Sequence, residues 1–227
     1  DVICLTMRRY KQLLSGRKLD CVHIPIGAYH EPKLLDESHS QELLFFTTLA
    51  PFKGLEILIE AFCKLRIKYP HLKLNIAGTE HARFHNYLHE LRIHFNVLIG
   101  IRWLGQIPED QVINLFRDSQ IIVLPYAAST GSSSVLYQAA PWGRAVVASD
   151  LEEICALAVE NDLQVEFFRT GNADSLCASI QRLLDSTMKR RLQAEYNFKS
   201  ILTTRPEETG KRYLHAFNLA FEKRKSA

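Results

Sequence analysis

Two loops in the sequence bring side chains suited to anion binding to the start of predicted helices. Residues 47–54 (TTLAPFKG) follow an apolar run that ends at Phe46, and they lead into an amphipathic segment that begins just after Lys53. A helix N-terminus carries unpaired backbone N–H groups and the positive end of the helix dipole. A lysine at that position therefore indicates a phosphate site. A solvent-exposed lysine in a turn is the alternative interpretation.

The second loop, residues 125–134 (PYAASTGSSS), also links an apolar run to a predicted helix. Its small hydroxyl side chains offer a helix N-cap, and they leave backbone N–H groups free to face a ligand. Gly131 allows the backbone to approach that ligand closely. An ordinary capped loop is the alternative, and the sequence has neither a GxxxxGK[ST] nor a GxGxxG motif.

Three histidines invite a metal interpretation. His81, His85 and His89 step by four residues along a helix expected over residues 81–94, and two histidines on one helix face can chelate zinc. No cysteine neighbours them, and His89 and His94 are one residue too far apart for an HExxH motif. We therefore expect a solvated histidine face and no metal.

The elements that must position these loops alternate along the chain. Short apolar runs rich in β-branched residues predict strands at residues 2–5, 21–25, 43–47, 72–77, 101–104, 121–124, 145–148 and 165–168. Segments of helical period predict helices at residues 54–68, 81–94, 109–117, 133–140, 152–161, 173–184, 189–199 and 207–223. This alternation is typical of right-handed βαβ crossovers, so the sequence predicts an α/β fold with a Rossmann-like, doubly wound parallel sheet. Ligands bind at the carboxyl ends of the strands in such sheets.

The composition restricts the class of protein. The chain has 227 residues, of which 47% are hydrophobic, and a net charge of +3. This composition excludes a disordered chain, a collagen-like fibre and a coiled coil. Five cysteines without a CxxC pair favour reduced, packed thiols in a cytoplasmic protein. The sequence shows neither a signal peptide nor a run of about 18 apolar residues. We expect no nucleic-acid partner and at most peripheral contact with the inner membrane surface, since the short basic cluster near the end, residues 223–225, suits a solvated tail.

Four blocks of sequence, taken in order, resemble the C-terminal, donor-binding domain of the group 1 (family 4) glycosyltransferases of GT-B fold. They are residues 43–62 (LLFFTTLAPFKGLEILIEAF), 72–78 (LKLNIAG), 101–116 (IRWLGQIPEDQVINLF) and 121–150 (IIVLPYAASTGSSSVLYQAAPWGRAVVASD). The resemblance implies transfer of a sugar, with retention, from a nucleotide-sugar to a glycan, lipid or small-molecule acceptor. It also implies that neither a cofactor nor a metal is needed.

The resemblance assigns roles to residues of both loops. Lys53 falls on the family's phosphate-binding lysine, which neutralises the diphosphate leaving group, and so it is the candidate catalytic residue. The candidate donor-binding residues are Thr48, Lys53, Thr130, Gly131, Ser132, Ser133, Ser134 and Gln138.

Three of these positions depart from the family's pattern. Thr48 stands where the family usually has an arginine, and Thr130 and Gln138 stand where it usually has the two glutamates of an E-x7-E motif. Gln138 can still hydrogen-bond ribose hydroxyls as a neutral group. A non-catalytic nucleotide- or sugar-binding module with a regulatory or scaffolding role is therefore the alternative function. An unrelated flavodoxin-like or response-regulator domain would need clustered aspartates at its first strand ends, and the sequence has none there.

The resemblance also predicts how the chain is organised. Residues 1–20 would end a missing N-terminal domain, residues 21–202 would form the Rossmann-like domain, and residues 203–227 would form a linker and a helix that crosses back. Residues 27–41 are predicted to be an irregular linker. On this interpretation the chain is the second half of a longer one, and alone it should bind donor without turnover.

Overall fold

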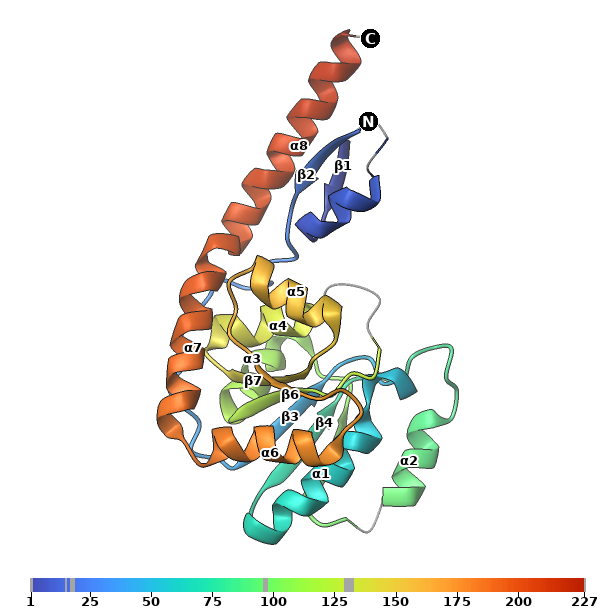
Figure 1. Cartoon of the computed structure of the whole chain (residues 1–227), viewed down its shortest axis with the longest axis vertical. Coiled ribbons are helices and arrows are strands. Elements are labelled where there is room, and N and C mark those ends of the chain that lie inside the picture. The colour runs from blue at the N-terminus through green and yellow to red at the C-terminus, as the bar shows by residue number, and fades with distance from the viewer. Residues whose placement is uncertain (1, 15, 17–18, 96–97, 129–132, 227) are drawn as a thin grey trace.

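The core of the fold is a six-stranded parallel sheet (Figure 1). The computed structural model describes residues 2–14, 16, 19–95, 98–128 and 133–226. Every neighbouring pair of strands in this sheet is parallel. The strand order is β5 (Ile101–Gly105), β4 (Lys73–Ala77), β3 (Glu42–Phe46), β6 (Ile121–Leu124), β7 (Ala145–Ser149) and β8 (Glu166–Phe168). The predicted doubly wound α/β class is confirmed.

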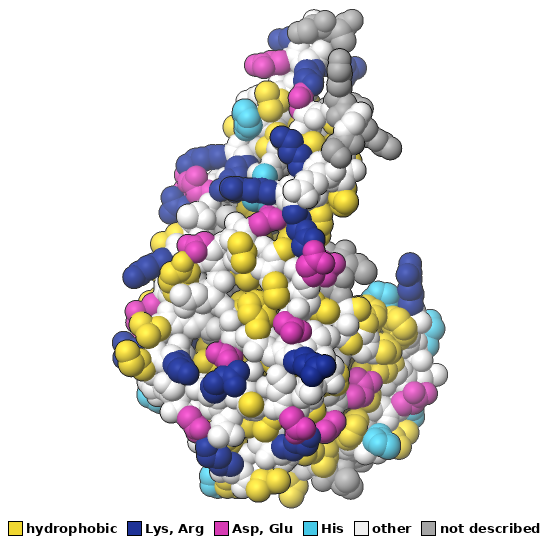
Figure 2. Space-filling view, viewed as in Figure 1, with side chains coloured by type: hydrophobic (Ala, Val, Ile, Leu, Met, Phe, Trp, Pro, Cys, Tyr) yellow, Lys and Arg dark blue, Asp and Glu magenta, His cyan; other side chains and the backbone are white. Residues whose placement is uncertain are grey.

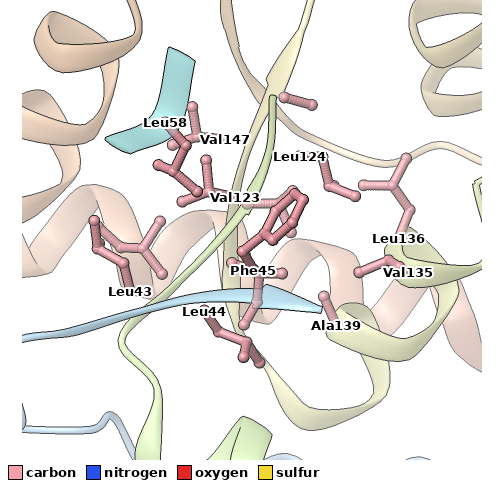
Figure 3. Close-up of a cluster of buried hydrophobic side chains, with 14 of the residues drawn as sticks. Leu43, Leu44, Phe45, Leu58, Val123, Leu124, Val135, Leu136, Ala139 and Val147 are labelled. Carbon is pink, nitrogen blue, oxygen red and sulfur yellow. The ribbon is translucent and has the colours of Figure 1, made fainter. Parts of the chain in front are cut away.

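Helices cover both faces of the sheet. Figure 1 shows α1 (Leu55–Lys68) and α6 (Ala173–Leu184) side by side on one face, with α3 (Glu109–Asp118), α4 (Ser134–Ala139) and α5 (Glu152–Glu160) on the other. The chain continues through α7 (Thr187–Ile201), which packs against β7. All residues of β6 and β7 are buried, as strands covered on both sides must be. Figure 3 shows side chains of β3, β6 and β7 meeting Leu58 of α1 and Leu136 of α4 in this core.

The strand order reverses between β3 and β6, and this reversal decides where a ligand fits. The chain runs outward from β3 to β4 and β5, and then returns to place β6 on the other side of β3. The connections that leave β3 and β6 therefore diverge to opposite faces and leave a crevice between them. Residues 47–54 on one side, and residues 125–128 with Ser133 on the other, flank that crevice.

A second, two-stranded parallel sheet lies apart from the first. It pairs β1 (Val2–Leu5) with β2 (Asp20–His23), and the 3-10 helix η1 (Arg8–Leu14) connects them. The long helix α8 (Pro206–Ser226) extends beside both strands (Figure 1). The boundary predicted after residue 20 falls at the start of β2, and it stays a prediction.

No helix within the described ranges combines the length and the apolar character needed to cross a bilayer. The longest of them, α8, carries Lys223, Arg224 and Lys225 in its last turn. Elsewhere on the face seen in Figure 2, basic and acidic side chains are interspersed. Some acidic and basic side chains form surface ion pairs, such as Lys68 with Asp185.

The helix predicted over residues 81–94 is wrong in its first half. The helix α2 spans only Tyr87–Phe95, because Asn86 adopts a left-handed conformation with φ 72° and interrupts the helical path. His81 and His85 therefore precede the helix, and the three histidines do not share a helix face. No cluster of metal-ligating side chains occurs in the part of the chain that the structure describes.

The expectation of packed cysteines is also partly wrong. All five are free thiols, but Cys4 and Cys63 are exposed, while the other three are half-buried. Cys63 follows the buried Phe62 on α1, and it lies at the edge of the stripe that Leu58, Ile59 and Phe62 turn to the core. The apolar residues of α1 extend one position beyond the face that the core covers, and Cys63 occupies that position.

Candidate functional site

The two loops that flank the crevice are fastened to each other through their backbones. The Phe52 carbonyl oxygen accepts hydrogen bonds from the N–H groups of Ala127 (2.9 Å) and Ala128 (3.3 Å). Gly54 follows with φ 70°, and a Cβ atom there would lie 1.9 Å from the carbonyl oxygen of Pro125. Only glycine allows this approach, so the glycine between Lys53 and α1 sets the distance between the loops.

This contact places Lys53 on an aromatic surface. Its Nζ lies 3.9 Å from the centroid of the Tyr126 ring and 5.5 Å from that of Phe52. Tyr126 is buried, which raises the pKa of its hydroxyl. Lys53 itself is half-buried, and burial lowers the pKa of its ammonium group. The rings offset part of this desolvation by cation–π attraction.

A cleft of about 540 Å³ opens beside this lysine at the carboxyl ends of β3, β4, β5 and β6. Of the described residues that line it, Lys53 alone carries a formal positive charge, and none is an aspartate or a glutamate. A half-buried cation facing a cleft without a carboxylate attracts an anionic ligand.

Most of the predicted site residues meet in this cleft. Thr48, Lys53, Ser133, Ser134 and Gln138 all line it. Thr130, Gly131 and Ser132 lie outside the described residues. Ser133 occupies the N-cap position of α4, but its side chain makes no capping hydrogen bond.

The loop after β4 also contributes to the cleft, although no sequence motif indicates it. Thr79 and His81 line the cleft from there, next to the backbone of Gly78. The spacing of His81 from His85 and His89 wrongly indicates a solvated helix face. His81 lies four residues after the end of β4, and ligands bind at the carboxyl ends of parallel strands. This position in the sequence could have indicated that His81 lies at the site.

A larger cavity of about 720 Å³ lies elsewhere, between the linker at residues 34–39 and α7. Its two buried cations are already engaged. Arg144 donates hydrogen bonds to the carbonyl oxygens of Phe116, Gly143 and Asp36, and Arg190 forms an ion pair with Glu37 (2.5 Å). These contacts hold the linker to the domain, so the cleft at Lys53 is the better candidate for a ligand site.

Comparison with known proteins agrees with this geometry. Residues 40–186, which include the reversal of strand order and both loops, match the family described as glycosyl transferases group 1. The chain belongs to this family. It is 27% identical over 191 residues to a phosphatidyl-myo-inositol mannosyltransferase of Mycolicibacterium smegmatis, in a match that covers 81% of this chain and 47% of that protein. The chain thus spans about half the length of this curated relative.

Solved structures share the fold at low sequence identity. HepE of Anabaena, in complex with UDP and glucose, has a TM-score of 0.78 at 16% identity, covering 96% of this chain and 63% of that one. Sucrose-phosphate synthase of Thermosynechococcus elongatus has a TM-score of 0.76 at 16% identity, covering 98% and 59% of the two chains. These similarities extend the family assignment to the GT-B type of glycosyltransferase fold.

The fit of Gly54 against Pro125 predicts a large cost for any side chain there. Gly54→Ala should lower the free energy of unfolding by about 3 kcal/mol, since it adds a backbone clash to left-handed strain. Gly171→Ala is the matched control, because Gly171 has φ 76° but a Cβ atom there would meet nothing within 4 Å. That variant should lose only about 1 kcal/mol in denaturant titration. Equal losses in the two variants would contradict the close contact.

The burial of Lys53 predicts an unusual titration. Its pKa should lie below the ordinary value of 10.5, because burial penalises the charged form and the described lining of the cleft supplies no carboxylate. Addition of pyrophosphate should raise it, since an anion favours the ammonium form. The pKa without and with pyrophosphate can be measured from the pH dependence of the Lys53 ¹³Cε resonance in NMR spectra. That resonance is assigned by its loss in the Lys53→Arg variant. A pKa at or above 10.5 without ligand would contradict the burial of this group.

Proposed function

We propose that this chain binds the nucleotide-sugar donor of a retaining glycosyltransferase and that Lys53 contacts the donor diphosphate. The single observation that carries this proposal is the half-buried Lys53 ammonium, held on Tyr126 beside a cleft whose described lining has no carboxylate. The family to which the chain belongs supports the reaction class.

The chemistry follows from where charge develops. When the bond between sugar and diphosphate breaks, negative charge accumulates on the departing phosphate oxygens. An ammonium group fixed in a site with little water stabilises that charge more strongly than bulk solvent does. Because the loop contact holds Lys53 in place before the ligand arrives, little reorganisation is needed during the reaction.

Relatives and structural neighbours support the substrate class. HepE has been solved with UDP-glucose, and the curated relative is named as a mannosyltransferase. By analogy, we propose a nucleoside diphosphate sugar as donor, with Gln138 and Ser134 positioned along the same cleft. A glycan, lipid or small-molecule acceptor would be held by a further domain, because the chain spans less than half of this relative.

One observation favours a second candidate function. Gln138 presents a neutral amide to the cleft, and Thr48 presents a hydroxyl, so the described lining supplies one charged group for donor recognition. A module that binds nucleotide-sugars without transferring them would need no more. Transfer assays of a protein that pairs this chain with its acceptor-binding domain separate the two functions, since only the enzyme forms a glycosylated product.

The diphosphate contact predicts the effect of removing Lys53. In calorimetric titrations with UDP, GDP and ADP, Lys53→Ala should weaken binding of the preferred nucleotide by about 1–3 kcal/mol, the range for a charge-assisted hydrogen bond. Lys189→Ala is the control, since Lys189 is exposed on α7, away from the cleft. Equal affinity of wild type and Lys53→Ala would refute the phosphate role.

The lack of a carboxylate in the described lining predicts binding without a divalent cation. Protein sites for magnesium usually include one or two carboxylate ligands, and the described lining of this cleft offers none. Nucleotide affinity should therefore change by less than about twofold when EDTA replaces Mg²⁺ in the titration. A loss of tenfold or more in EDTA would overturn this expectation.

A further inference from the structure

We propose that His81 donates a hydrogen bond from its Nε2 to a phosphate oxygen of the bound nucleotide, as a partner of Lys53. This inference rests on the proposed function and adds a second diphosphate-binding residue to it. Three observations carry it: the anchored backbone of His81, the fixed state of its ring, and an aromatic neighbour that it shares with Lys53.

The backbone of His81 is tied to the lysine loop. Its N–H donates to the carbonyl oxygen of Leu49 (2.8 Å), and the N–H of Leu49 donates to the carbonyl oxygen of Thr79 (2.8 Å). Gly78 makes the approach possible, because a Cβ there would lie 1.8 Å from the carbonyl oxygen of Thr47. The loops after β3 and β4 therefore form one rigid wall of the cleft.

The ring of His81 is held in one orientation. Its Nδ1 accepts a hydrogen bond from the backbone N–H of Arg83 at 3.2 Å. The neutral imidazole therefore carries its proton on Nε2, which leaves a donor for a ligand in the cleft. The ring also packs against Phe84, at 5.6 Å between centroids.

Phe52 connects the two proposed phosphate partners. Its ring meets that of His81 edge-on, with centroids 6.2 Å apart, and the Nζ of Lys53 lies 5.5 Å from its centroid. His81 and Lys53 thus flank one aromatic side chain, and both line the cleft.

The ligand's chemistry needs a second donor. A nucleoside diphosphate presents several charged oxygens, and one ammonium group satisfies only part of them. No carboxylate is among the described residues that line the cleft, so none of them offers Nε2–H an anionic acceptor. A phosphate oxygen is therefore its best acceptor, ahead of a neutral ribose hydroxyl or a base.

The test uses two substitutions, each of which replaces the function of one of the two imidazole nitrogens. His81→Asn keeps an acceptor for the Arg83 N–H but loses the outer donor, whereas His81→Gln can return an amide N–H near the position of Nε2. His85→Asn is the matched control, because His85 is exposed on the same segment and does not line the cleft. Thermal unfolding of all variants verifies that they fold.

UDP and uridine are the probes, with GDP and guanosine in their place if the wild type prefers them. His81→Asn should weaken diphosphate binding about tenfold and leave nucleoside binding, measured by ligand-observed NMR, within about twofold. His81→Gln should recover most of the loss, and His85→Asn should match the wild type.

Unchanged UDP affinity in His81→Asn would overturn the inference, and so would an equal loss for UDP and uridine, which would place His81 at the base or ribose. A loss in His81→Asn that His81→Gln does not recover would also overturn it, because packing would then explain the effect. If the wild-type protein binds no nucleoside diphosphate, both the proposed function and the role of His81 are refuted.

If the wild-type protein binds UDP or GDP but the His81 variants behave differently from these expectations, only the role of His81 is refuted.

Discussion

The contact between Gly54 and the carbonyl of Pro125 is the constraint on which the site depends. It joins two loops that leave neighbouring strands in opposite directions, and the hydrogen bonds to the Phe52 carbonyl secure the same junction. Without this junction, nothing would hold the loop of Lys53 against the loop of Tyr126 where the strand order reverses. With it, a cation rests on an aromatic ring beside a cleft before any ligand arrives. The sheet positions the two loops, and this junction holds their side chains together beside the cleft.

The same arrangement carries a cost for the folded protein. The half-buried ammonium group of Lys53 loses part of its hydration, which lowers its pKa. Cation–π attraction to the rings of Tyr126 and Phe52 offsets only part of that loss in free energy. A bound anion would restore the missing charge partner. The core below the site compensates for this cost, since β6 and β7 are buried along their whole length between two layers of helices. Sites that keep unsatisfied charges for a ligand commonly rely on stability gained elsewhere.

The fold was predictable from the sequence because apolar runs and helical periods are local signals. The predicted strands at residues 2–5 and 121–124 and the helix at residues 173–184 have the observed bounds. Lys53 was also predictable, because its position between a strand and an amphipathic helix is a local pattern. The family resemblance predicted the correct family and fold, while reaction, donor, acceptor and stereochemical outcome are proposals.

Other features of the site depend on contacts between residues distant in sequence. The stacking of Lys53 on Tyr126 arises only when β3 and β6 become neighbours, and neither loop encodes it alone. The four-residue spacing of histidines misplaces His81 because it resembles a helix, and a single left-handed residue, Asn86, stops that helix. Local spacing patterns thus identify elements and single loop residues such as Lys53, but they do not show which loop residues contact one another at the ends of the strands.

The most direct test of the central claim is a crystal structure of this chain with bound UDP or GDP. The account predicts that a phosphate oxygen lies about 2.7–2.9 Å from the Nζ of Lys53, the range of a charge-assisted hydrogen bond. A nucleotide whose phosphates lie instead in the cavity beside Arg144 and Arg190, with Lys53 free of contact, would contradict it.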